Sequence, residues 1–279
     1  MLRDAYLRCR DALRDGGLED AAFEAQCMIE QLTGRDRAAQ LAHGDEPFEH
    51  QDALDKMIER RLDHEPLQYI LGSWSFGGFD FAVGEGVLIP RDDTEVALGL
   101  CLDCLRGRRG AKAIDLCSGS GAIAVALQKR TGCEMTAVEL SDKAFYFLKK
   151  NILSNQAAVT PVKGDVLRCF EDFPDGIFDL IVSNPPYIKT ADLPTLQDEV
   201  RFEPRMALDG GESGYDFYEA ILRDWTRKLK NGGAIVFELG EEQAATVASL
   251  MRAQGFRDIR TEKDFGGIQR AIIGIKTDI

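Results

Sequence analysis

Five apolar runs that alternate with helical patterns constrain the fold of this chain more than any other feature. They read K-A-I-D-L, E-M-T-A-V-E-L, T-P-V-K-G-D-V, F-D-L-I-V-S and G-A-I-V-F-E-L. Such alternation predicts a mostly parallel sheet with helices on both faces. Two further runs, F-R-D-I-R-T-E-K-D-F and Q-R-A-I-I-G-I-K, are joined by a glycine pair and predict an antiparallel hairpin at the C-terminal end. The expected fold class is α/β.

The residues before this sheet show a different pattern. Up to about residue 70, apolar residues recur three and four positions apart in three short segments, which predicts a small bundle of amphipathic helices. Residues 73–90 alternate aromatics and glycines, as a β-hairpin does. The expected domains are a helical domain over 1–72, a hairpin linker over 73–90 and a sheet domain over 91–279.

The helix that opens the sheet domain is expected to begin at R-D-D-T-E. Asp92 is suited to cap that helix, and Glu95, three residues later, would complete a capping box. These acids therefore have a purely structural interpretation.

The charge balance argues against long nucleic acids as partners. Lysine and arginine total 34 against 47 aspartate and glutamate residues, a formal net charge of −13. Tight binding to a polyanion depends largely on neutralising phosphates, which this composition does poorly. We expect no direct binding to nucleic acid.

The cysteines and the hydropathy pattern indicate the cytoplasm. Seven cysteines without a secretory leader suggest reduced thiols, and no run is apolar enough to span a bilayer, so no membrane association is expected. Cys101 and Cys104 form a C-x-x-C, but no second pair and no nearby histidine accompany them. We interpret these two residues as helix packing and expect no metal site.

The first strand of the sheet runs into a glycine-containing loop, D-L-C-S-G-S-G-A-I-A. Gly119 and Gly121 allow a tight turn through which backbone N–H groups approach a ligand. Glu139 ends the second strand, where a carboxylate accepts hydrogen bonds from ribose hydroxyls. These features alone fit a dinucleotide as well as other nucleotide-like cofactors.

Two further carboxylates favour S-adenosylmethionine. Asp115, just before the glycines, suits a cationic amino-acid group but not a pyrophosphate. Asp165, after the third strand, is placed to accept from an adenine amino group, although a helix cap explains it as well.

The fourth strand ends in N-P-P-Y at residues 184 to 187. Proline donates no hydrogen bond and holds the residue before it extended, so Asn184 and Pro185 present acceptors on a stiff frame beside the Tyr187 ring. A simple strand-ending turn is the alternative. Because the carboxyl ends of parallel strands bind ligands in open α/β sheets, we expect these acceptors to bind an NH2 group.

The order of these motifs resembles that of class I S-adenosylmethionine-dependent methyltransferases, which have a Rossmann-like sheet. Within that class N-P-P-Y marks methylation of a planar amino nitrogen. P-L-Q-Y-I-L-G, V-L-I-P-R-D-D-T-E and E-V-R-F-E-P-R-M-A-L-D-G-G-E-S-G are similar to the release factor glutamine methyltransferases of the HemK/PrmC type, and these motifs cover nearly the whole chain in order.

The resemblance implies transfer of a methyl group to the amide nitrogen, N5, of the glutamine in the Gly-Gly-Gln motif of class I peptide chain release factors. Residues 1–72 carry no cofactor motif and are expected to bind this substrate, and the enzyme is expected to be a monomer. The catalytic residues would be Asn184, Pro185, Pro186 and Tyr187. The cofactor would contact Asp115, Cys117, Ser118, Gly119, Gly121, Glu139, Asp165, Val166 and Asn184. The substrate would contact Arg91, Glu203, Pro186 and Tyr187.

Two positions depart from the family pattern. Glycine usually stands where this chain has Cys117, which is tolerable if φ there is negative. Proline usually stands at Asp92, so Arg91 is expected to be posed less rigidly. Residues 188–214 are longer than an ordinary loop and are expected to form a lid or a substrate grip.

Three alternatives remain from the sequence. An adenine-N6 methyltransferase shares the acceptor geometry but needs to flip a base, for which a basic groove is expected. A ribosomal protein is another possible carrier of the glutamine. An interaction protein that retains the fold without activity is the third, against which the intact N-P-P-Y argues.

Overall fold

The structure is a computed structural model that describes residues 1–277. Residues 278 and 279, which end the domain expected over 91–279, lie outside the described residues. The chain forms two compact units. The first contains Met1–Ser73 together with Gln197–Phe202, and the second contains Trp74–Leu196 together with the residues from Glu203 onward.

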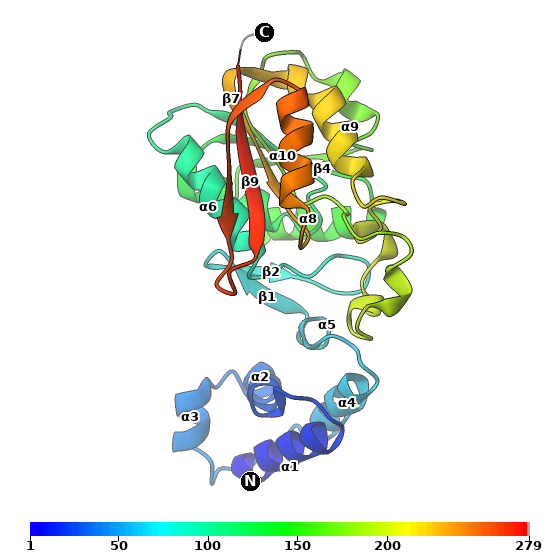
Figure 1. The fold of residues 1–279 in the computed structure, drawn as a ribbon. Helices are drawn as coiled ribbons and strands as arrows, with labels where there is room; N and C mark the ends of the chain where they lie inside the picture. The colour runs from blue at the N-terminus through cyan, green and yellow to red at the C-terminus, as the bar shows by residue number, and fades with distance from the viewer. Residues whose placement is uncertain (278–279) are drawn as a thin grey trace. The chain divides into compact units, whose positions relative to one another are not determined.

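The first unit contains the predicted small helical bundle (Figure 1). Its core joins buried residues of the three longest helices, such as Leu13, Met28 and Leu54. These stripes recur at helical spacing, which is why the helices form where the pattern predicts them. The helices are α1 (Leu2–Asp15), α2 (Ala21–Thr33), α3 (Arg37–Ala42), α4 (Gln51–Leu62) and α5 (Leu67–Leu71).

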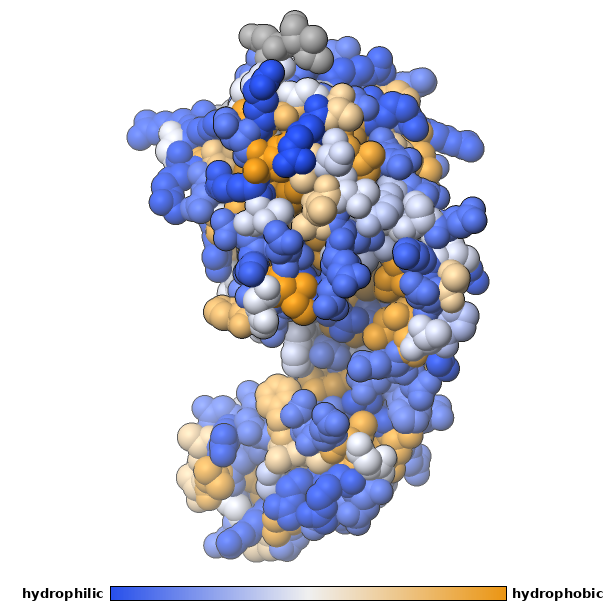
Figure 2. All heavy atoms as spheres, viewed as in Figure 1, coloured by the Kyte–Doolittle hydropathy of each residue, from blue (hydrophilic) through white to orange (hydrophobic). Residues whose placement is uncertain are grey.

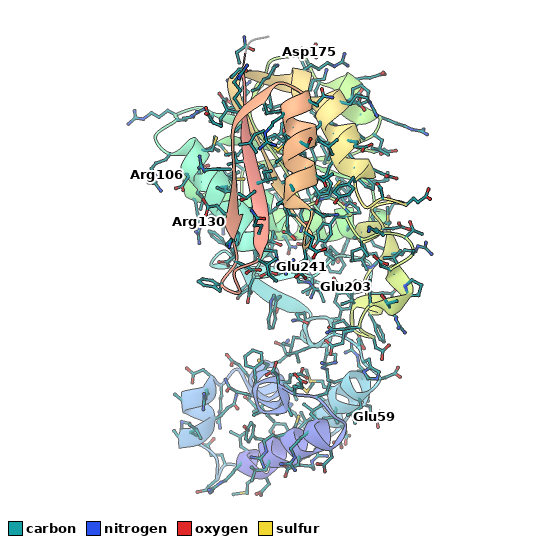
Figure 3. All side chains as sticks on the ribbon, viewed as in Figure 1. Glu59, Arg106, Arg130, Asp175, Glu203 and Glu241 are labelled. Atoms are coloured by element: carbon teal, nitrogen blue, oxygen red, sulfur yellow. The ribbon has the colours of Figure 1, made fainter. Side chains whose placement is uncertain are left out.

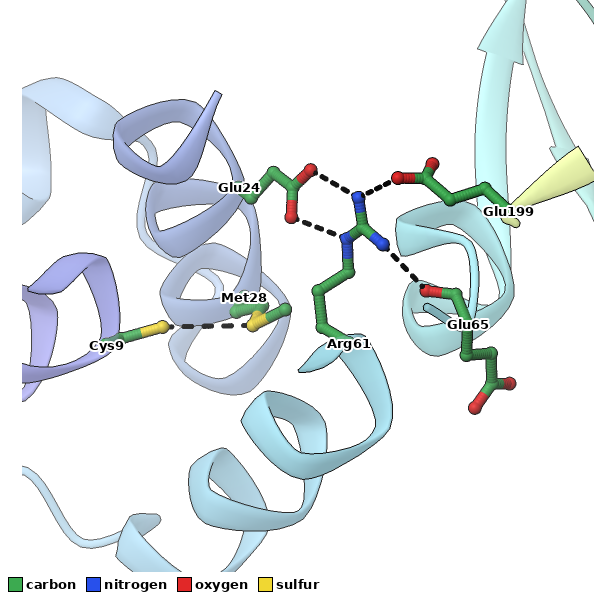
Figure 4. Close-up of polar contacts among 6 residues, drawn as sticks. All are labelled: Cys9, Glu24, Met28, Arg61, Glu65 and Glu199. Atoms are coloured by element: carbon green, nitrogen blue, oxygen red, sulfur yellow. Dashed lines mark hydrogen bonds and ion pairs between the residues drawn. The ribbon is translucent and has the colours of Figure 1, made fainter. Parts of the chain in front are cut away.

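A buried ion pair ties the segment Gln197–Phe202 to these helices (Figure 4). Arg61, 2% exposed, donates two hydrogen bonds to Glu24, at 2.7 and 2.9 Å, and a third to Glu199 at 2.5 Å. Because Glu199 lies far along the sequence, no local pattern signalled that its segment joins the first unit.

The second unit contains the predicted sheet, with strand order β5-β4-β3-β6-β7-β9-β8. The first five of these strands are parallel, and β9 and β8 are antiparallel, as predicted. The strands are β3 (Lys112–Leu116), β4 (Glu134–Glu139), β5 (Val159–Lys163), β6 (Phe178–Ser183), β7 (Leu229–Glu238), β8 (Phe256–Lys263) and β9 (Gln269–Lys276). A separate hairpin, β1 (Ser73–Phe76) and β2 (Phe79–Ala82), precedes them.

Helices cover both faces of this sheet, because its strands carry apolar residues at nearly every position. On β7, Ala234 and Val236 pack with one set of helices, whereas Ile235 and Phe237 pack with the other. The first set is α6 (Thr94–Leu105), α7 (Ala122–Thr131) and α8 (Asp142–Ser154), and the second is α9 (Asp216–Trp225) and α10 (Ala244–Ala253). Cys101 is buried on α6 among the first set.

The predicted capping box is wrong. Helix α6 begins at Thr94, after Asp93, and among the described residues no side chain caps it. The Glu95 carboxylate instead accepts a hydrogen bond from the backbone N–H of Gly77 at 2.8 Å. The Glu95 carboxylate, which the local pattern predicted as a cap of α6, therefore binds the turn of the β1–β2 hairpin instead.

The surface is mixed and shows small apolar patches. Hydrophilic residues cover most of the face shown in Figure 2. Large exposed apolar side chains such as Leu41, Leu153 and Phe265 come from separate parts of the sequence. No helix among residues 1–277 is both long and apolar enough to cross a bilayer.

Candidate active site

The carboxyl ends of the parallel strands border a cavity of about 690 Å³. The chain proceeds outward from β3 to β5 and then returns to place β6 on the other side of β3. Ligands bind at such a switch point in open α/β sheets. Nine of the residues proposed from the sequence border the cavity: Asp115, Cys117, Ser118, Gly119, Glu139, Asp165, Val166, Asn184 and Pro186. Arg91 does not border it, although its neighbours Ile89 and Pro90 do.

Two consecutive residues in the middle of the loop between β3 and α7 are held by hydrogen bonds to β4. The Ser118 N–H donates to the Val138 carbonyl at 2.9 Å, and the Gly119 N–H donates to Glu139 at 2.8 Å. Gly119 has φ of +56°, a conformation that glycine adopts without strain. Gly121 is set back from the cavity, where an added Cβ would meet Leu148 at 2.5 Å.

The expectation of a negative φ at Cys117 is wrong. Cys117 has φ of +62°, in the left-handed region. The next two residues, Ser118 and Gly119, are held to β4 by these hydrogen bonds, and a side chain in the left-handed region costs about 1–2 kcal/mol. The conformation suited to glycine is therefore kept in spite of the substitution.

Asp115 is the least satisfied polar side chain of the site. It is 1% exposed, and neither carboxylate oxygen has a hydrogen-bond partner within residues 1–277. Burial raises the pKa of Asp115 to about 8, although the nearby Ser118 side chain and Ala124 backbone oppose the rise. A buried carboxylate without partners is unfavourable, so this position is suited to a cationic group.

Glu139 is buried at the end of β4 but is satisfied by the backbone. Besides Gly119, its carboxylate accepts from the Ser141 N–H at 2.6 Å. Burial raises the pKa of Glu139, and these two backbone N–H groups oppose the rise. A carboxylate has about four lone-pair sites, so acceptor capacity remains toward the cavity.

Asp165 does not cap a helix, because the next helical turn, Cys169–Asp172, begins after Arg168. One carboxylate oxygen accepts from the Leu167 N–H at 2.9 Å, which closes a local turn. The residue also borders the cavity. The local turn thus holds the carboxylate at the cavity wall.

The N-P-P-Y segment follows β6 at the same edge of the sheet. The Asn184 side-chain NH2 lies 3.5 Å from the Thr94 hydroxyl, so its carbonyl oxygen is directed away from Thr94. Pro185 and Pro186 are buried. An added Cβ at Gly210 would lie 2.6 Å from the Tyr187 Cα, so glycine is required where the two backbones meet.

Sequence reasoning missed two residues that hold Tyr187 in place. The Gln243 side chain donates to the Tyr187 carbonyl at 3.1 Å, and the Tyr187 hydroxyl lies 3.5 Å from the Glu238 carboxylate. Glu238 ends β7, beside β6. An acidic residue that ends an otherwise apolar buried strand, in G-A-I-V-F-E-L, was the available signal.

Glu203 and Arg91 form an ion pair with each other. Glu203, labelled in Figure 3, is 4% exposed, pairs with Arg91 and accepts from the Ile89 N–H at 2.9 Å. Burial raises the pKa of Glu203, and Arg91 opposes the rise. Because the carboxylate is used within the protein, Arg91 is the more accessible member of the pair.

Comparisons with known proteins identify the family. A family model described as PrmC N-terminal domain matches residues 4–72, and one described as Methyltransferase small domain matches residues 83–200. A release factor glutamine methyltransferase from Geobacter sulfurreducens is 42% identical over 95% of this chain and 93% of its own length. One from Bordetella pertussis is 39% identical over 94% of this chain and 96% of its own length.

A solved structure supports the fold. The crystal structure of a methyltransferase from Pyrococcus furiosus has a TM-score of 0.54 and 21% identity, covering 72% of this chain and 90% of that chain. The cavity at the carboxyl ends of the strands, the N-P-P-Y segment beside it and the similarity along nearly the full length lead to one conclusion. The chain belongs to the release factor glutamine methyltransferase family.

Proposed function

We propose that this protein transfers a methyl group from S-adenosylmethionine to the side-chain amide nitrogen of the glutamine in the Gly-Gly-Gln motif of class I release factors. The observation that carries the proposal is the orientation of Asn184. Its NH2 group is directed to Thr94, which leaves its carbonyl oxygen as an acceptor at the cavity. The substrate offers the matching donor, an amide NH2.

The residues around the cavity fit S-adenosylmethionine. The unpartnered Asp115 carboxylate would pair with the ammonium group of the methionyl part. Glu139 would accept from the ribose hydroxyls, and Asp165 from the adenine amino group. Gly119 leaves open space where a Cβ would stand, so the backbone can approach the ligand closely. When bound, this cofactor supplies a strongly electrophilic methyl group.

The N-P-P-Y segment would activate a poor nucleophile by holding it. The lone pair of an amide nitrogen is delocalised into its carbonyl. If the Asn184 carbonyl oxygen and the Pro185 carbonyl each accept one N–H, the nitrogen is fixed and its lone pair is directed into the cavity. Both hydrogen bonds strengthen as positive charge develops on the nitrogen. The amide proton then leaves to water, so no general base is needed beforehand.

Other parts of the chain would bind the release factor. We assign this task to the helices of residues 1–72 and to the segment 188–214, which includes the Arg91-paired Glu203. Tyr187 and Pro186 would pack against the flat amide of the glutamine. We further propose that the enzyme acts as a monomer, and in the cytoplasm, because its substrate is a translation factor.

The test is a methylation assay with labelled S-adenosylmethionine. A class I release factor, the same factor with the glutamine of Gly-Gly-Gln replaced, a ribosomal protein fraction and DNA are offered side by side. We expect label in the unmodified release factor alone, on the glutamine side chain by mass spectrometry. Label in the ribosomal fraction or in DNA, with none in the release factor, would replace the proposed substrate.

A further inference from the structure

Glu238 is a buried carboxylate that the mechanism above leaves unused. It is 3% exposed, and its Oε2 atom has no hydrogen-bond partner in the described part of the chain. It does not border the cavity, whereas Asn184 and Thr94 do. Because burying a carboxylate without full pairing is unfavourable, its presence here calls for a reason other than stability.

The sheet register brings Glu238 to the level of Asn184. Ser183 and Phe237 are paired across the parallel strands β6 and β7, so the residues that follow them lie side by side. Phe237 packs with α9 and α10, and side chains alternate along a strand. Glu238 is therefore directed to the opposite face, where α6 begins at Thr94.

Two hydroxyl groups connect Glu238 to the residues that would bind the substrate. The Tyr187 hydroxyl lies 3.5 Å from Glu238 Oε1. The Thr94 hydroxyl faces the same carboxylate and opposes the rise in its pKa. If Thr94 donates its proton toward Glu238, its lone pairs are left to accept from the Asn184 NH2 group, 3.5 Å away. That arrangement selects the Asn184 orientation in which the carbonyl oxygen faces the cavity.

We propose that Glu238 is a positioning residue for methyl transfer, which acts through the hydroxyls of Tyr187 and Thr94 to hold the Tyr187 ring and the Asn184 amide in the orientation that receives the substrate. This inference rests on the proposed function. Burial raises the pKa of Glu238 to about 7, with Asp93 adding to the rise and Arg270 opposing it. The Tyr218 hydroxyl donates a hydrogen bond to the backbone carbonyl of Glu238 at 2.8 Å.

The experiment compares Glu238→Leu with Glu238→Gln. Leucine removes the acceptor, whereas glutamine keeps the size and one acceptor. We expect kcat on the release factor to fall by about tenfold or more in Glu238→Leu, the equivalent of one hydrogen bond to a charged group, and by less than about threefold in Glu238→Gln. The affinity for S-adenosylmethionine, measured by calorimetry, stays unchanged because Glu238 lies outside the cavity. The melting temperature stays equal or rises, since an unpaired buried carboxylate is removed.

A double-mutant cycle tests the route through Tyr187. In a Tyr187→Phe background the hydroxyl is absent, so Glu238→Leu is expected to lower kcat less than it does in the wild type. The matched control is Glu241→Gln, an exposed acid three residues further along (Figure 3), which should leave kcat unchanged. A role in stability alone predicts the reverse pattern, with a lower melting temperature and an unchanged kcat.

Wild-type turnover is measured first. Its absence on the release factor would remove the proposed function and this inference together. Wild-type turnover with an unchanged kcat in Glu238→Leu, or strictly additive effects in the cycle, would overturn this inference alone. If Glu238→Leu does not fold, Glu238→Asp is tested instead. Aspartate keeps the charge but places it one methylene further from the two hydroxyls. An unchanged kcat in that variant would also overturn this inference.

Discussion

At the scale of single residues, the site depends on polar atoms whose partners are only partly supplied by the protein. Asn184 directs its NH2 group to Thr94, so its carbonyl oxygen is directed away from that residue. Asp115 keeps both carboxylate oxygens without partners among residues 1–277. Such groups are unfavourable in a folded chain, and binding a ligand relieves that cost.

The first prediction concerns Asn184→Ala. The substitution removes one acceptor and leaves the Pro185 carbonyl, so the substrate can still enter the cavity. Because the lost interaction strengthens as charge develops, we expect kcat to fall by about a hundredfold or more while the affinity for S-adenosylmethionine stays nearly unchanged. Asn184→Asp keeps the acceptor and should retain part of the activity. If Asn184→Ala keeps the wild-type kcat on a release factor with its Gly-Gly-Gln loop, the proposed role of Asn184 as an acceptor is contradicted.

The second prediction concerns the pH dependence of stability. The pKa of Asp115 is about 8 in the ligand-free fold, well above that of an exposed aspartate. A raised carboxyl pKa stabilises the fold below the unfolded-state value, and this contribution is lost as pH rises to about 8. Asp115→Asn lacks this loss, so its stability advantage over the wild type should grow by at most about 1.4 kcal/mol per pH unit between pH 6 and 8.

Thermal melts of both ligand-free proteins at several pH values measure this difference. Asp115→Asn should also bind S-adenosylmethionine more weakly, because a neutral amide cannot pair with the ammonium group. A melting-temperature difference that is the same at every pH would mean that Asp115 is already ionised or paired.

The third prediction concerns the strained residue of the cofactor loop. Cys117→Gly removes the strain of a side chain on a left-handed backbone, about 1–2 kcal/mol. Glycine also gives the unfolded chain more conformational freedom, which lowers stability by about 0.5–1 kcal/mol. The net gain in stability should be about 0.5–1 kcal/mol, measured by urea unfolding. Cys117→Ser is the matched control, since it removes the thiol and keeps the strain. If Cys117→Gly is instead less stable than Cys117→Ser by about 0.5–1 kcal/mol, the cost of added chain freedom alone, then φ at this position carries no cost.

At the scale of elements, residues 188–214, which follow N-P-P-Y, form short turns. One part of this segment belongs to the first unit and the rest to the second. Residues Gln197–Phe202 join the helices of the first unit, whereas Glu203 pairs with Arg91 in the second. The buried Arg61 provides the anchor for the first part, through Glu199 and Glu24. This small ion-pair network therefore fixes where the segment runs.

The fourth prediction separates the two carboxylates of this network. Arg61→Met leaves Glu24 buried without its cation and should lower stability by about 3–5 kcal/mol. Glu199→Gln removes a pair whose carboxylate side chain is 42% exposed, so screening by water limits the loss to about 1 kcal/mol or less. Hydrogen exchange over Gln197–Phe202 should nevertheless quicken in Glu199→Gln. Glu59→Gln, an exposed acid on α4, is the control, and equal exchange in both variants would argue against the anchor.

At the scale of the whole molecule, the two units are linked by more than one crossing of the chain. The chain leaves the first unit after Ser73, returns at Gln197 and leaves again after Phe202. The cavity and the nine proposed residues that border it belong to the second unit. The proposed cofactor contacts therefore all lie in one unit, and the helices of the first unit contribute no residue to the cavity.

The fifth prediction tests that division. A truncated chain that begins at Ser73 keeps the cavity, so its affinity for S-adenosylmethionine should stay within about threefold of the wild type. Turnover on a folded release factor should fall by about a hundredfold, because binding energy from remote contacts is lost. A short Gly-Gly-Gln peptide, compared in both proteins, should show a smaller difference. Full activity of the truncated chain on the folded factor would give the helices another role.

The sequence by itself determined the elements and the chemistry that depends on local order. Apolar periodicity predicted the three longest helices of the first unit and the strands of the second, because burial of a stripe or a face depends on spacing. The short helices α3 and α5 were not predicted. The position of each motif after its strand predicted the cavity wall, since the carboxyl ends of parallel strands share one edge. Asp115, Glu139 and Asn184 were all located in this way.

Only the tertiary structure decided which distant groups share a hydrogen bond. The Glu95 carboxylate accepts from Gly77 and not from its own helix, and Cys117 has a positive φ beside two residues that are hydrogen-bonded to β4. Glu238 came beside Asn184 through strand register, and Glu199 joined helices more than a hundred residues earlier through Arg61. A hydrogen bond depends on distance and direction in space, which spacing along a chain does not encode when the partners lie on different elements.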